Sequence, residues 1–145
     1  MNALELVRQV TALTGFTHSA GVRVIAAEPG RVEMSLPKKP ELLQFNGFFH
    51  GGIVSGLADH AAGAAATTAL PTGKIAVTVD LHVNFLAPAS GPAIVARART
   101  IQVGATLCVV TVEVETEATA GVRLCAVANA VLRVVDMPPM HTPGG

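Results

Sequence analysis

The sequence predicts an α+β fold of two layers, in which one antiparallel sheet of about six strands carries a single long helix. The first observation behind this prediction is that residues 51–69 are the only long helical candidate in the middle of the chain. The second is that four stretches rich in Val, Ile, Leu and Thr, joined by short turns, follow from Lys74 onward. Parallel crossovers need a dozen residues or more, so these short turns favour antiparallel neighbours.

The elements are read in order from the spacing of apolar residues. Leu4, Val7, Val10 and Leu13 recur at helical spacing and predict a short helix over residues 3–14 that covers an edge of the sheet. The pattern of residues 22–27 and 31–36 predicts a hairpin. Residues 38–49 show neither the spacing of a helix nor the alternation of a strand, so we expect a loop there. The remaining strands are expected at residues 75–85, 93–102, 106–116 and 122–135.

Length and composition limit what the chain can be. It has 145 residues, of which 50% are hydrophobic and only 14% charged, so we expect an ordered chain rather than a disordered one. We expect a single domain over residues 1–136 and a flexible tail over residues 137–145, which are rich in Pro and Gly. So little charge in so apolar a chain also favours at least a dimer.

Charge and segment patterns exclude several partners. Ten Lys plus Arg balance ten Asp plus Glu without a run of like charge, so neither nucleic acid nor a membrane surface is an expected partner. Glu5 and Arg8 interrupt the first apolar stretch, which is atypical of a signal peptide. Asp59 and His60 stand at the centre of the longest weakly polar stretch, residues 51–69, which argues against a membrane span. We therefore expect a cytoplasmic protein.

The two cysteines are expected to remain reduced. On the hairpin of residues 106–135, Cys108 should lie opposite residues 131–133, which leaves Cys125 out of register for a disulfide.

One face of the central helix draws attention because a carboxylate stands among small residues. Helical spacing places Gly52, Gly56, Asp59, Gly63 and Ala66 on the same face. A carboxylate there must be paired, hydrated in a cleft, or raised in pKa, and any of these suits a general base or a nucleophile. The alternative is that Asp59 is paired with His60 or an arginine for packing alone, or that its face opens to solvent.

The start of this helix offers a complementary feature. In His50-Gly51-Gly52, unpaired backbone N–H groups of the two glycines would point outward at the positive end of the helix dipole. Such donors can hold a carbonyl oxygen as it becomes an oxyanion. Two adjacent glycines are equally compatible with an ordinary tight turn.

Other chemistries find no support. Ser55 lies inside the helix and lacks the Gly-x-Ser-x-Gly pattern of a nucleophile elbow. The five histidines show no metal-binding spacing, and no phosphate-binding or dinucleotide-binding glycine motif occurs. We therefore expect no metal and no cofactor.

Several motifs together resemble the PaaI-type hotdog acyl-CoA thioesterases. They are Gln-Phe-Asn-Gly-Phe-Phe-His-Gly-Gly at residues 44–52, Leu-Ala-Asp at residues 57–59, Val-Thr-Val-Asp-Leu at residues 77–81, and Asn-Phe-Leu-Ala-Pro-Ala at residues 84–89. The resemblance implies a hotdog fold, in which a curved sheet wraps the central helix. It also implies a homodimer with two sites at the subunit interface, which we expect to assemble further into a homotetramer, a dimer of dimers.

The same resemblance implies roles for particular residues. Asp59 matches the catalytic carboxylate, Gly51 the glycine whose N–H polarises the thioester carbonyl, and Gln44 a residue that assists there, although Asn46 is an alternative to Gln44. Thr78 matches a hydroxyl that orients water, but is equally well explained as an ordinary strand Thr. The substrate-binding residues are expected to be His50, Gly52, Asn46 and Phe85.

The expected function is hydrolysis of a medium-chain or aromatic acyl-CoA. The alternatives are a non-catalytic acyl-CoA-binding protein and an enoyl-CoA hydratase-like enzyme, which would use an Asp and a His as a working pair. Lys74, Arg97 and Arg99 are candidate partners of the coenzyme A phosphates, although a solvated strand face explains the two arginines better.

Overall fold

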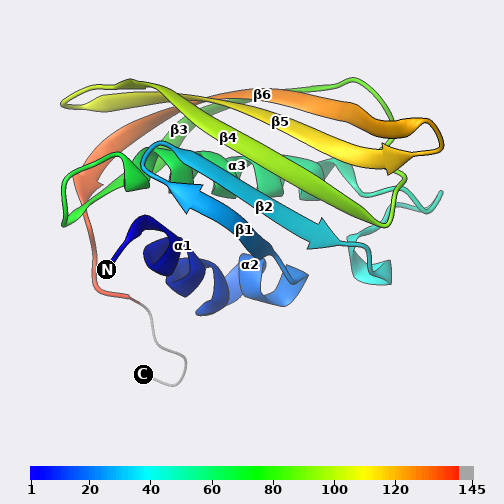
Figure 1. Cartoon of the computed structure of the whole chain (residues 1–145), viewed down its shortest axis with the longest axis horizontal. Helices are drawn as coiled ribbons and strands as arrows, with labels where there is room; N and C mark the ends of the chain where they lie inside the picture. Colours follow the sequence, from blue (N-terminus) through cyan, green and yellow to red (C-terminus); the bar gives the residue numbers. More distant parts are fainter. Residues whose placement is uncertain (141–145) are drawn as a thin grey trace.

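A computed structural model describes residues 1–140 as one sheet with helices on its inner side and beside one edge (Figure 1). The helices are α1 (Ala3–Ala12), α2 (Gly15–Ala20) and α3 (Gly51–Thr68), with a 3-10 turn, η1 (Pro40–Leu42). The strands are β1 (Arg23–Glu28), β2 (Arg31–Pro37), β3 (Lys74–Phe85), β4 (Ala93–Val103), β5 (Leu107–Ala118) and β6 (Gly121–Asp136). The predicted α+β fold, a sheet of six strands curved around a central helix, is confirmed. Residues 141–145 of the expected tail lie outside the described residues.

All strand pairs are antiparallel, but the strand order β1-β2-β4-β5-β6-β3 departs from the expected pairing of sequence neighbours. β3 pairs with β6 at the far edge instead of with β4. Neighbouring strands lie about 4.8 Å apart, so β3 and β4 are separated by about 14 Å. The connection over residues 86–92 spans that distance easily, because an extended chain covers about 3.3 Å per residue.

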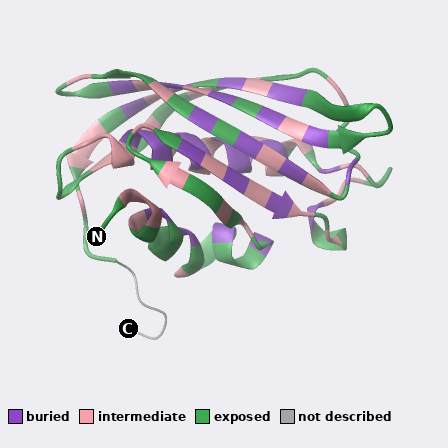
Figure 2. Cartoon of the chain, viewed as in Figure 1, coloured by how far each residue is buried: buried purple, intermediate pink, exposed green. Residues whose placement is uncertain are grey.

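The core lies between α3 and the inner face of the sheet. The buried face of α3 consists mainly of alanines with Val54 and Leu57, so the helix packs close to the sheet. Alternate residues of β5, such as Val110, Val112 and Val114, are buried against it, while Glu113 between them is exposed. Figure 2 shows this alternation of buried and exposed residues along the strands. Within residues 1–140, no helix is both long enough and apolar enough to cross a membrane.

The N-terminal region differs from the expected single helix over residues 3–14. α1 begins with a capping box between Asn2 and Glu5 and ends at Ala12. It ends there because Thr14 is extended, with φ −172°, and Gly15 has a φ of +81° that disfavours other residues. The sequence does not predict the second helix, α2, because its residues show no apolar periodicity. α1 packs on edge strand β1, so the predicted covering of an edge is confirmed.

The opposite edge of the sheet is open. β3 pairs with β6 on one side only, and within residues 1–140 no strand pairs with its other side. Val77 and Val79 on this edge are 46% and 58% exposed. A long, partly apolar edge strand is a template for pairing with another strand.

The cysteine register agrees with the prediction, since Cys108 lies opposite Leu132. Cys125 is also buried, and its thiol donates to the Val114 carbonyl at 3.3 Å. Burial raises the pKa of the Cys125 thiol, which keeps it protonated.

Candidate active site

The structure brings two predicted site residues, Asp59 and Thr78, into direct contact. The Thr78 hydroxyl on β3 donates a hydrogen bond of 2.7 Å to Asp59 Oδ1 on α3. Asp59 is half-buried, and within residues 1–140 it forms no ion pair. The alternative in which Asp59 serves as half of an ion pair with His60 or an arginine is therefore wrong. The carboxylate is oriented by a neutral hydroxyl and keeps its second oxygen for other contacts.

His60 points away from this contact. Its Nε2 is hydrogen-bonded to the Thr11 hydroxyl of α1 at 2.8 Å. Burial lowers the pKa of His60, although the neighbouring Asp59 charge opposes this effect, so the imidazole is held neutral. Because Asp59 and His60 have different partners on different elements, they do not form the acid–base pair that a hydratase would need. Sequence reasoning missed Thr11, since no local pattern links residues so far apart in the chain.

A cavity of about 280 Å³ adjoins the carboxylate. It lies between α1, α3 and β3, and both Asp59 and Thr78 form part of its wall. The rest of the wall is mostly apolar. A carboxylate at the edge of an apolar cavity is a common arrangement for a group that acts on a bound substrate.

The start of α3 corrects one prediction and supports another. The N–H of Gly52 is not free, because it donates to His50 Nδ1 at 2.9 Å, which makes His50 the cap of the helix. The N–H groups of Ile53 and Val54 both donate to the His50 carbonyl. Within residues 1–140 the N–H of Gly51 has no acceptor, so it is the donor that remains at the positive end of the helix dipole.

The loop before α3 is a tight turn that carries Gln44. The Gln44 N–H donates to the Phe48 carbonyl at 2.8 Å, and its side-chain amide lies 3.5 Å from the Phe49 carbonyl, two residues before Gly51. The Asn46 side chain instead accepts from the Phe48 N–H at 3.2 Å and is used within the turn. The tip residue Phe45 is 99% exposed, which is unusual for a large apolar side chain.

Phe85, an expected substrate-binding residue, stands beside this helix end. A Cβ at Gly51 would lie 3.4 Å from the Phe85 ring, which is itself 57% exposed. The free N–H of Gly51 therefore has an apolar surface next to it.

The two parts of the predicted site are far apart within one chain. Gly51 and Asp59 are eight residues apart on α3, which corresponds to about 12 Å along the helix axis. A nucleophile and an oxyanion donor must both lie about 3 Å from the same reacting group. One chain alone does not bring these two groups to the same carbonyl.

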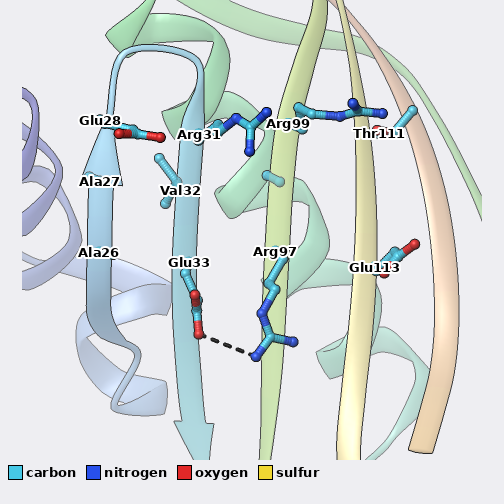
Figure 3. Close-up of a pocket in the computed structure, with 11 residues that line it drawn as sticks. Ala26, Ala27, Glu28, Arg31, Val32, Glu33, Arg97, Arg99, Thr111 and Glu113 are labelled. Atoms are coloured by element: carbon cyan, nitrogen blue, oxygen red, sulfur yellow. Dashed lines mark ion pairs between the residues drawn. The ribbon is translucent and has the colours of Figure 1, made fainter.

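A second cavity, of about 570 Å³, lies across β1, β2, β4 and β5 (Figure 3). Its charged side chains, such as Arg97 and Glu113, lie on the outer face of the sheet, and none of the expected catalytic residues lines it. Arg97 pairs there with Glu33 and Glu115, as the solvated-face explanation predicts. Lys74 pairs with Asp136 and lowers the pKa of that carboxyl. Both cations thus have carboxylate partners within the chain, which weakens their candidacy as phosphate partners.

Comparisons with known proteins agree with this geometry. Residues 46–122 match the family described as the Thioesterase superfamily. The structure resembles a thioesterase family protein from Silicibacter pomeroyi, with TM-score 0.89 and 33% identity, covering 94% of this chain and 100% of that one. It also resembles a thioesterase from Haemophilus influenzae, with TM-score 0.81 and 25% identity, covering 95% and 94% of the two chains. The sequence is 26% identical to 1,4-dihydroxy-2-naphthoyl-CoA hydrolase of Listeria monocytogenes, over 79% of this chain and 94% of the relative.

Proposed function

The chain belongs to the Thioesterase superfamily and is a thioester hydrolase with the hotdog fold, and we propose that its substrate is an acyl-CoA with a medium-chain or aromatic acyl group. The observation that carries the catalytic part of the proposal is the contact between Asp59 and Thr78 at the wall of an apolar cavity. The naphthoyl-CoA hydrolase relative supports an aromatic acyl group.

In the proposed reaction, the Asp59 carboxylate takes a proton from water, and the oxygen of that water attacks the thioester carbonyl carbon. The carbonyl oxygen becomes an oxyanion, which accepts a hydrogen bond from the N–H of Gly51. The C–S bond then breaks, the coenzyme A thiolate leaves and takes up the proton held by Asp59, and the acyl group is released as a carboxylic acid. Direct attack by Asp59, followed by hydrolysis of the resulting anhydride, uses the same groups.

We place each site between two chains, with Gly51 and Gln44 from one and Asp59 and Thr78 from the other. The separation of about 12 Å along α3 supports this assignment, since one chain does not complete the site. The exposed Phe45 tip and the open β3 edge are surfaces that a partner would cover. A two-fold dimer forms such a contact twice and so yields two sites. Assembly into a homotetramer remains part of the proposal.

Thiol release from a panel of acyl-CoAs tests the proposed substrate class. We expect turnover with medium-chain and aromatic acyl groups. Binding without thiol release across the whole panel would contradict the enzyme and support the non-catalytic acyl-CoA-binding alternative.

Replacing Thr78 tests whether its hydroxyl orients the carboxylate. Thr78→Val should lower kcat about tenfold to a hundredfold, because a hydrogen bond to a charged group contributes about 1.5–3 kcal/mol. Thr111→Val, on the outer face of β5, is the matched control and should leave kcat unchanged. An unchanged kcat in Thr78→Val would make Thr78 an ordinary strand residue.

A further inference from the structure

We propose that the cavity between α1, α3 and β3 holds the acyl group of the substrate and that α1 sets the limit on its size. This inference rests on the proposed function, since it takes Asp59 as the carboxylate that acts on the thioester.

The position of the cavity is the first argument. Asp59 and Thr78 line it together, so the carboxylate borders the space directly. The reaction requires the thioester carbonyl carbon to lie beside Asp59. The acyl group is bonded to that carbon, so it begins within a few ångströms of the carboxylate. The larger cavity, in contrast, lies on the other face of the sheet and does not border the carboxylate.

The chemistry of the wall is the second argument. α1 contributes Leu6, Val7 and Val10, and no lysine or arginine of the part of the chain that the structure describes lines the cavity. Among the described residues 1–140, the titratable side chains in the wall are Asp59 and His60. His60 is turned toward Thr11. Such a wall suits an apolar acyl group and does not suit the phosphates of coenzyme A, which would need cationic partners.

The volume sets the size class. A water molecule occupies about 30 Å³ of liquid, so a cavity of about 280 Å³ holds roughly nine atoms of that size. This matches an acyl group of about eight to ten non-hydrogen atoms, which includes a single-ring aromatic acyl group or an eight-carbon chain. Because Leu6, Val7 and Val10 of α1 form one side of this space, we expect α1 to obstruct longer chains.

α1 is fixed in place rather than loosely attached. The buried Thr11 hydroxyl bonds to His60, the residue after Asp59, and the Thr17 hydroxyl donates to the Thr11 carbonyl at 2.8 Å. These bonds join α1 and α2 to α3 beside the carboxylate. Val10, one residue before Thr11, is thereby held in the outer wall and is 36% exposed.

Gly63 is the wall position at which the cavity can be filled. A Cβ there would find its nearest neighbour, the Ala76 carbonyl oxygen, at 4.0 Å, so a small side chain fits without a clash. Alanine is also more favourable than glycine inside a helix by about 1 kcal/mol. Gly63→Ala and Gly63→Val thus form a graded series that fills the cavity, while Val10→Ala enlarges it.

The experiment measures two quantities on these variants for straight-chain acyl groups from acetyl to dodecanoyl. One is kcat/KM for thiol release, and the other is Kd for the corresponding non-hydrolysable thioether analogues. Val122→Ala, which is 68% exposed near the β5–β6 turn, is the matched control for Val10→Ala.

We expect Gly63→Val to weaken octanoyl binding and turnover relative to acetyl by about tenfold or more, since a misfit of one methylene already changes discrimination by that amount. Gly63→Ala should lie between wild type and Gly63→Val, and Val10→Ala should move the preferred length upward. The inference would be overturned if Gly63→Val and Val10→Ala showed the same chain-length preference as Val122→Ala. Shifted Kd values without any thiol release would uphold the pocket and reject the proposed hydrolysis.

Discussion

Asp59→Asn is expected to keep the fold and to lower kcat by about 10² to 10⁴, the usual contribution of a positioned base, or more for a nucleophile. The substitution is isosteric, and the amide oxygen can still accept the hydrogen bond from Thr78 that the structure shows at 2.7 Å. What it removes is the negative charge and the basicity that the reaction needs. The measurement is kcat for thiol release together with the thermal unfolding midpoint.

Asp80→Asn is the matched control, because Asp80 lies two residues after Thr78 on β3 and is exposed. It should leave kcat within a few-fold of wild type. If Asp59→Asn also retained kcat within a few-fold and lost only thermal stability, Asp59 would have a packing role alone.

Gly51→Pro should lower kcat by about 10² to 10³, the cost of removing one oxyanion donor. Proline lacks the N–H that Gly51 presents, and it is well tolerated at the first position of a helix. The residue before a proline must be extended, and His50 already is, with φ −63° and ψ 141°. The backbone therefore accommodates the change while the donor disappears.

Gly51→Ala is the control for this second variant. It keeps the N–H and places a Cβ 3.4 Å from the Phe85 ring, an ordinary van der Waals contact. Its kcat should stay far above that of Gly51→Pro. Equal losses in the two variants would mean that the space beside Phe85 matters and the donor does not.

Much of the fold is predictable from local pattern. The strand over residues 106–116 alternates Val with Thr and Glu, and β5 occupies nearly that range. The helix over residues 51–69 ends before Pro71 and Gly73, and α3 ends at Thr68. Asp59 is conspicuous because it is a lone carboxylate on a face of small residues. These features depend on residues close together in the chain.

The features that were missed depend on contacts between distant residues. The short β3–β4 connection suggested adjacent strands, but strand order depends on which edge is free when the sheet closes over α3. The bond between His60 and Thr11 joins residues 49 positions apart, and nothing in either local sequence indicates it. The Gly52 N–H was expected to be free, because the orientation of the His50 ring cannot be read from the motif.

The most direct test of the shared site mixes the two inactive chains. When Asp59→Asn and Gly51→Pro chains are unfolded together and reassembled at random, about half of the dimers are mixed. In each mixed dimer one site contains both substitutions, and the other has intact Asp59 and Gly51. Half of the dimers therefore have one working site of two, so the mixture should regain about a quarter of wild-type activity. Two different tags on the chains would show that the dimers have exchanged. If the exchanged dimers were no more active than the two variants alone, the result would contradict a site built from both chains.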